Sequence, residues 1–83
     1  MSEIEILENL RKELKDKINF EKESEKRYWN DLCEYSKTHP TDKLNIEHRK
    51  ELLLRETGLI NGLNIALIRV EKALRKAKMN NTL

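Results

Sequence analysis

The sequence predicts an all-α protein in which two long helices form an antiparallel hairpin that self-associates into a four-helix bundle. Its 83 residues include only two glycines and one proline, and 39% of them are charged, which is typical of long helices and coiled coils. Apolar residues recur every three or four positions over most of the chain, the spacing of one helical face. The proline, Pro40, lies between two such segments. We therefore expect a single domain over residues 1–83.

The first helix is expected over about residues 3–38. Ser2 and Glu5 have the spacing of a capping box, in which each side chain binds a backbone N–H group at the start of a helix. Pro40 ends the helix because it lacks a backbone N–H and disfavours helical geometry at the preceding residue. One apolar face carries Leu7, Leu10, Leu14 and Ile18. This face is interrupted over residues 21–27, which contain no apolar side chain.

The second helix is expected over about residues 43–79, after a turn at about residues 39–42. Thr41 and Asp42 can both cap its N-terminus, because their side-chain oxygens accept hydrogen bonds from backbone N–H groups. A seven-residue repeat is formed by Ile46, Leu53, Ile60, Leu67 and Leu74. A second set falls outside this stripe and consists of Leu54, Ile65 and Ile68. A helix that is apolar over so much of its circumference needs more than one neighbour.

Self-association is expected because the first helix cannot cover the second along its whole length. In an antiparallel hairpin, the polar run at residues 21–27 lies opposite roughly residues 53–59, which include three leucines. A chain of this size also gains little from its own core, and a single cysteine, Cys33, excludes an internal disulfide. The expected oligomer interface consists of Leu53, Leu54, Gly58, Ile60, Gly62, Asn64, Ile65 and Ile68.

Two glycines lie four residues apart, Gly58 and Gly62, in the most apolar part of the second helix. Each costs up to about 1 kcal/mol in a helix relative to alanine. We interpret them as a flat patch that lets another helix approach closely. The alternative is a kink or break near Gly58, which would give a three-helix bundle. Asn64 lies beside the apolar stripe and can fix the register of an oligomer.

The expected function is that of a non-enzymatic protein-interaction or regulatory module, such as an inhibitor, an adaptor or an assembly factor. The candidate partner-binding residues are Phe20, Tyr28 and Trp29, since tryptophan and tyrosine often anchor protein interfaces. The alternative for these aromatic residues is core packing near the turn. Small helical proteins of this style are frequent in phages and mobile elements.

The alternative function is RNA or DNA binding by a hairpin dimer, similar in shape to the plasmid copy-control RNA-binding protein of the Rop type. Arg69, Lys72 and Lys76 share one helical face and are the candidates to contact phosphates. The net charge is only +2, from 17 basic and 15 acidic residues. Strong basicity is the usual mark of a nucleic-acid-binding domain, so protein binding is the favoured class.

Nothing in the sequence predicts an enzyme, a metal site or a cofactor. Cys33, His39 and His48 are too few and too scattered for a metal centre, and the chain has no glycine-rich phosphate loop. The longest uncharged stretch, residues 57–68, is too short to span a membrane. The acidic start lacks the features of a secretory signal. We therefore expect a cytoplasmic protein that makes no membrane contact.

Overall fold

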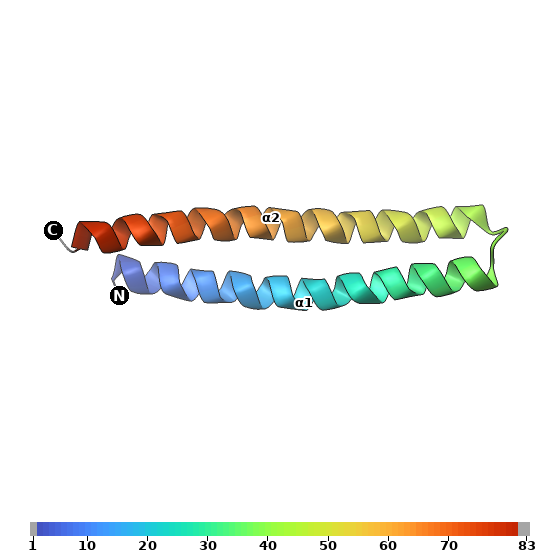
Figure 1. The fold of residues 1–83 in the computed structure, drawn as a ribbon, viewed down its shortest axis with the longest axis horizontal. Coiled ribbons are helices and arrows are strands. Elements are labelled where there is room, and N and C mark those ends of the chain that lie inside the picture. The colour runs from blue at the N-terminus through green and yellow to red at the C-terminus, as the bar shows by residue number, and fades with distance from the viewer. Residues whose placement is uncertain (1, 82–83) are drawn as a thin grey trace.

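The computed structural model describes residues 2–81, which form two helices joined by a short turn (Figure 1). Helix α1 spans Glu3–Thr38 and helix α2 spans Lys43–Asn81. The helices run antiparallel, so the two ends of the described chain lie together at one end of the molecule. The predicted all-helical hairpin is confirmed. The molecule is a rod of 65 × 15 × 14 Å.

The start of α1 follows the capping signal in the sequence. Ser2 has an extended backbone (φ −76°, ψ 159°), and its Oγ accepts a hydrogen bond from the Glu5 backbone N–H at 3.2 Å. Glu3 and Glu5 place negative charge in the first turn, where the helix dipole stabilises it. At the other end, the His39 N–H donates to the Tyr35 carbonyl at 2.8 Å. This bond closes the last turn before Pro40, which cannot continue the helix.

Asp42 connects the turn to α2. Its carboxylate accepts hydrogen bonds from the Asn45 backbone N–H at 3.4 Å, from the Asn45 side-chain amide at 2.7 Å and from the Tyr35 hydroxyl. These bonds lower the pKa of Asp42, and the side-chain bond from Asn45 is the largest cause. Of the two predicted caps, Thr41 and Asp42, it is therefore Asp42 that caps α2.

Tyr35 fixes the end of α1 to the start of α2. Its ring stacks on the His39 imidazole, with centroids 4.3 Å apart and an interplanar angle of 15°. The guanidinium carbon of Arg49, on α2, lies 3.7 Å from the centroid of the same ring. The Arg49 Nε is also 3.0 Å from a carboxylate oxygen of Asp31 on α1. A cation–π contact and an ion pair thus join the two helices near the turn.

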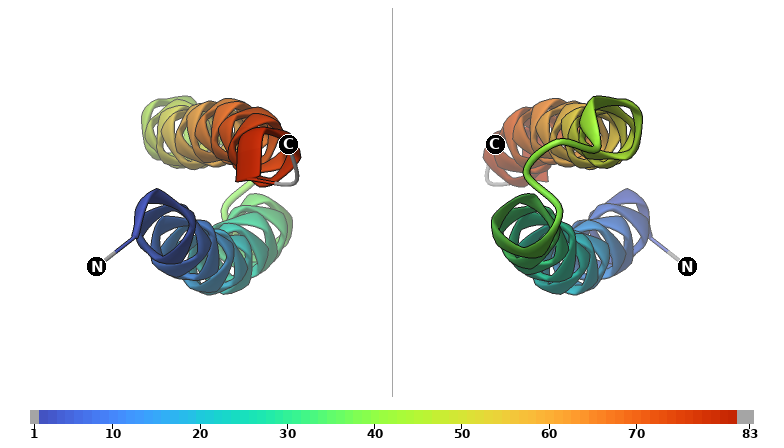
Figure 2. Two further views of the ribbon diagram at one scale, coloured as in Figure 1. Left: turned by 90° about the vertical axis from the view of Figure 1, so that its left-hand side faces the viewer. Right: turned by 90° about the vertical axis from the view of Figure 1, so that its right-hand side faces the viewer.

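The core between the helices is narrow. Among the described residues, the buried apolar side chains are Ile18 of α1 and Ile60, Leu74 and Ala77 of α2. The end-on views show two helices that incline across each other along their length (Figure 2). Each helix therefore covers one side of the other and leaves the rest of the circumference exposed.

Helix α2 continues through Gly58 and Gly62 without interruption. Neither glycine has a positive φ angle, so both have ordinary helical geometry. The alternative of a break near Gly58 and a three-helix bundle is therefore wrong. The helix also extends two residues past its predicted end, to Asn81.

We predict that Ile60→Ala lowers the free energy of unfolding by about 2–5 kcal/mol, because it leaves a cavity in this narrow core. The matched control is Ile6→Ala on α1, where the side chain is 51% exposed, and it should cost less than about 1 kcal/mol. Urea unfolding followed by circular dichroism, at one fixed protein concentration, measures both. Equal losses for the two variants would contradict the assigned core.

Candidate interaction surfaces

The hairpin exposes more surface than a compact protein of its mass. Its accessible surface is 6573 Å², whereas a folded monomer of 9.9 kDa exposes about 5,200 Å². Large apolar side chains contribute to this excess. Among residues 2–81, those that are more than half exposed are Ile6, Phe20, Trp29, Leu44, Leu54, Ile65, Ile68 and Met79. Single exposed apolar residues are common, but contiguous groups of them indicate interaction sites.

One such group lies on the outer face of α2, which we define as the side directed away from α1. The helical repeat of 3.6 residues places on it, between residues 47 and 76, a line of residues that are all exposed: Glu47, Lys50, Glu51, Leu54, Gly58, Asn61, Gly62, Ile65, Ile68, Arg69, Lys72 and Lys76. Leu54 is 70% exposed, and Ile65 is 53% exposed. Nothing lies within 4 Å of a Cβ built on either glycine. The apolar centre of this face is therefore uncovered in the hairpin.

The predicted oligomer interface divides between the outer face and the seam between the helices. The residues on the outer face are Leu54, Gly58, Gly62, Ile65 and Ile68. Ile60 is buried in the core, and Leu53 lines a pocket on the seam. Asn64 is half-buried. These three residues face or border α1, so the first five are the ones open to another chain.

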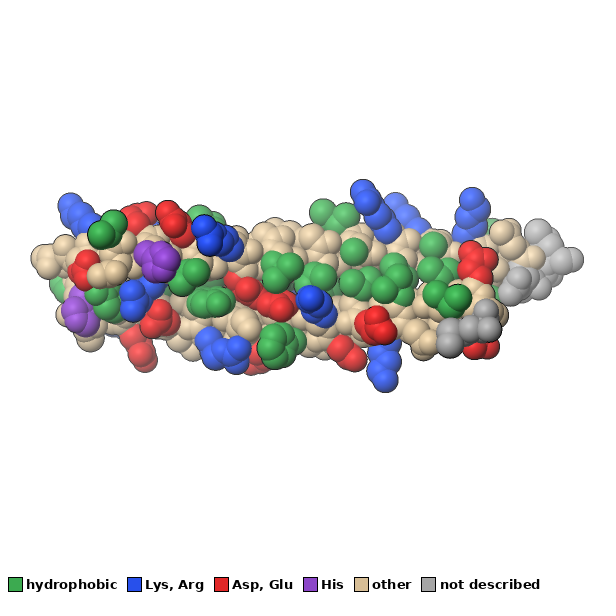
Figure 3. Space-filling model, turned by 180° about the vertical axis from the view of Figure 1, so that it is seen from behind, with side chains coloured by type: hydrophobic (Ala, Val, Ile, Leu, Met, Phe, Trp, Pro, Cys, Tyr) green, Lys and Arg blue, Asp and Glu red, His purple; other side chains and the backbone are tan. Residues whose placement is uncertain are grey.

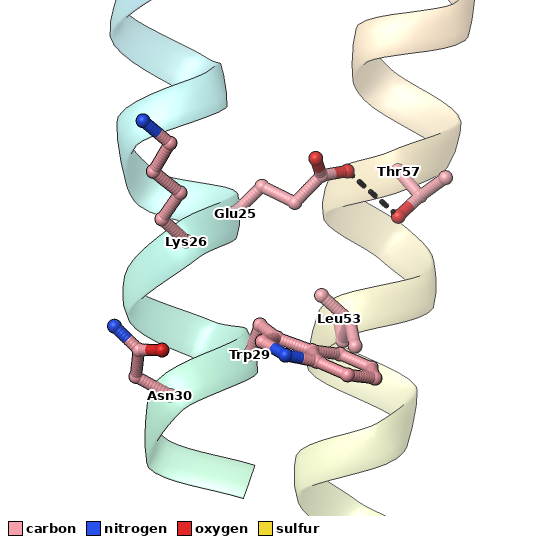
Figure 4. Close-up of a pocket in the computed structure, with 6 residues that line it drawn as sticks. All are labelled: Glu25, Lys26, Trp29, Asn30, Leu53 and Thr57. Atoms are coloured by element: carbon pink, nitrogen blue, oxygen red, sulfur yellow. Dashed lines mark hydrogen bonds between the residues drawn. The ribbon is translucent and has the colours of Figure 1, made fainter. Parts of the chain in front are cut away.

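The pocket on the seam has a volume of about 430 Å³ and is lined by Glu25, Lys26, Trp29, Asn30, Leu53 and Thr57. The Trp29 side chain extends from α1 toward Leu53, whereas Lys26 and Asn30 point away from α2 (Figure 4). Glu25 reaches across to α2, where it accepts a hydrogen bond from the Thr57 hydroxyl at 3.0 Å. Trp29 stays 56% exposed. The pocket thus combines an accessible aromatic wall with a polar rim, as protein interfaces do.

Three carboxylates meet on the seam at the level of this pocket. Glu21 and Glu25 of α1 raise the pKa of Glu56 on α2. The largest cause is the hydrogen bond that Glu56 can form with Glu21 once one of the two carboxyls is protonated, followed by burial and by the two negative charges, while Arg27 acts in the opposite direction. The polar run at residues 21–27 is therefore met by a carboxylate on α2, and like charges weaken the seam there.

Sequence reasoning located the polar run but missed its partner. Glu56 lies three residues after Leu53, at a position that Leu63, Val70 and Ala77 fill in later repeats. A carboxylate at this inner position, opposite two others in an antiparallel hairpin, was the signal that could have identified the cluster. The register of the hairpin is needed to recognise it.

The three candidate partner-binding aromatic residues do not form one cluster. Trp29 lines the seam pocket. Tyr28 is its chain neighbour, so it points about 100° away around α1, and it is 36% exposed. Phe20 lies nine residues from Trp29, which is half a turn around the helix, and it is 65% exposed. Of the three, Trp29 is therefore the one placed to bind a partner at the seam.

The candidate phosphate-binding residues lie toward the end of α2. Arg69, Lys72 and Lys76 are exposed, and none of them forms an ion pair among residues 2–81. Basic side chains project from α2 in the half of the molecule that contains the end of this helix (Figure 3). The same view shows hydrophobic side chains that follow the seam between the helices. A second hollow, of about 230 Å³, is lined by Arg11, Glu71, Leu74, Arg75 and Lys78.

The described residues bring together no group of three or more His, Cys, Asp or Glu side chains that could hold a metal ion. Cys33 is a half-buried free thiol. Over residues 2–81, neither helix is both long enough and apolar enough to cross a membrane. No family model, curated protein or solved structure matches the chain.

We predict that Glu56→Gln stabilises the hairpin at pH 7 and that this gain disappears near pH 4. A raised carboxyl pKa means that the folded state favours the protonated form. Protonated Glu56 therefore contributes stability to the hairpin below the ordinary pKa of 4.5, and this contribution is lost as the pH rises through the folded-state pKa. Glutamine carries no charge and does not lose it. Urea unfolding of both proteins across this pH range measures the difference. Glu34→Gln, at an exposed position of α1, is the control and should show no such pH-dependent gain.

Proposed function

We propose that this chain is a non-enzymatic protein-interaction module that acts as a self-associated assembly of helical hairpins. The observation that carries the proposal is the uncovered apolar centre of the outer face of α2, on a hairpin with so few buried side chains. The surface in excess of a compact monomer is about 1,400 Å². A standard interface buries about 800 Å² of each partner, so the excess surface is large enough to form one interface of ordinary size.

The surface proposed for the protein partner is the Trp29 pocket. It lies on the seam, so an assembly formed through the outer face of α2 leaves it accessible. Exposed tryptophan is among the residues that contribute most to protein binding. The carboxylates of Glu21, Glu25 and Glu56 give this level of the seam a negative character. The pocket therefore suits a partner segment that presents an apolar side chain next to a basic one.

A second candidate function is the binding of RNA or DNA through Arg69, Lys72 and Lys76. The specific observation in its favour is that all three are exposed and lack ion pairs among the described residues. Affinity for nucleic acid would fall steeply as salt is added, because phosphate contacts release bound counterions. Binding through the Trp29 pocket would require Trp29, whereas binding of nucleic acid would require Arg69, Lys72 and Lys76.

We predict that light scattering during size-exclusion chromatography gives the mass of at least two chains. Ile65→Lys places a charge in the apolar centre of the outer face and should return the mass to one chain, because an unpaired charge is costly to bury. Phe20→Lys is the control, since Phe20 is an apolar residue of α1 that is also more than half exposed, and it should leave the oligomer intact. A wild-type mass of one chain at all concentrations would contradict self-association. Dissociation by Phe20→Lys alone would place the contact on α1 instead.

A further inference from the structure

We propose that two copies of this chain meet through the outer face of α2, with their α2 helices antiparallel, about a two-fold axis that passes between Asn61 and Gly62. This inference rests on the self-association proposed above and adds to it the face, the direction and the register of the contact.

The charges on the outer face of α2 are arranged in order along the helix. The end near the turn carries Glu47 and Glu51, together with Lys50, which forms an ion pair with Glu47 at 3.1 Å. The centre is uncharged, and the end near the C-terminus carries Arg69, Lys72 and Lys76. A parallel second copy would set glutamate against glutamate and lysine against lysine. An antiparallel copy sets the acidic end of each helix against the basic end of the other, and two-fold symmetry makes every such contact twice.

The same register also places a large side chain opposite a glycine. An axis between Asn61 and Gly62 pairs Glu47 with Lys76, Glu51 with Lys72 and Gly58 with Ile65. Gly58 leaves open space where a Cβ would stand, and Ile65 is a large, half-exposed side chain. Ile65 of each copy can therefore pack against the exposed backbone at Gly58 of the other. Small residues at a helix contact allow this close approach.

A second copy fits the outer face of α2 better than an unrelated partner does. Its acidic half and its basic half complement each other within one chain, which is what an isologous contact requires. For an unrelated partner, the outer face would have to complement only the surface of that partner. The charges along α2 would then have no reason to complement each other. Because the outer face points away from α1, such a pair places four helices side by side and leaves the Trp29 pockets open.

The test uses two charge-reversed variants of the full chain. The first carries Glu47→Lys and Glu51→Lys, and the second carries Lys72→Glu and Lys76→Glu. In a homodimer of either variant, all four facing charge pairs become repulsive, so self-association should weaken at least about 10-fold. In an equimolar mixture, every facing pair of the heterodimer has opposite signs again, and association should return to the wild-type level. Sedimentation equilibrium measures association, and circular dichroism measures the helix content of each variant.

The outcomes separate this inference from the proposal on which it rests. A wild-type chain that stays monomeric overturns both. A wild-type chain that self-associates, together with variants that associate equally well alone, overturns the antiparallel register and leaves self-association standing. Weakened self-association of both variants supports the antiparallel register, because a parallel pair has four repulsive contacts in the wild type already. Restored association in the mixture shows that each variant folds.

A second measurement holds even if the charge-reversed variants lose helix content. In a Cys33→Ser background, Asn61→Cys lies beside the proposed axis and should form a disulfide with its own copy under mild oxidation. Ile68→Cys is the control, because antiparallel pairing separates it from its copy by roughly 20 Å along the helix axis. Cross-linking of both variants, or of Ile68→Cys only, overturns the register.

Discussion

Two antiparallel helices can cover only one side of each other, and this limit governs the rest of the structure. The hairpin has well-formed ends: Ser2 caps α1, Asp42 caps α2, and Tyr35 connects the turn to both helices. These polar contacts set the geometry, but they remove little apolar surface from water. Burial of apolar surface is the dominant favourable term in folding. A hairpin with a single narrow core therefore gains most from a second surface that covers what α1 leaves exposed.

The seam itself differs along its length. Near the turn, directional contacts of Tyr35 and Arg49 join the helices, and toward the chain ends Leu74 and Ala77 supply buried apolar surface. Between these regions Glu56 meets two other carboxylates, and like charges weaken the seam there. The Thr57 hydroxyl donates a hydrogen bond across the same level to Glu25, so polar contacts take the place of a continuous apolar core. The Trp29 pocket lies at this level, where an exposed indole stands beside carboxylates.

Local signals made much of the fold predictable. Ser2, Pro40 and Asp42 act on backbone groups within a few residues of themselves, so helix ends could be read without knowledge of tertiary contacts. Periodicity also showed which residues share a face of α2. It did not show which face α1 covers, so Ile60 and Leu53 were predicted in one interface together with Leu54 and Ile65. The Trp29 pocket and the Glu56 cluster depend on how far one helix is shifted against the other, which only the structure supplies.

The proposed contact between copies coincides with a segment of α2 that combines several destabilising features. Gly58 and Gly62 lower helix propensity, Glu56 weakens the seam, and Leu54 and Ile65 expose apolar surface, all within about three turns of α2. Within one chain, α1 packs only on the inner side of this segment, where Ile60 is buried. A second α2 helix packed against the outer side would cover the leucine and the isoleucine and fill the space above the glycines. Folding and association would then be coupled, because α1 covers one side of this segment and the second copy covers the other.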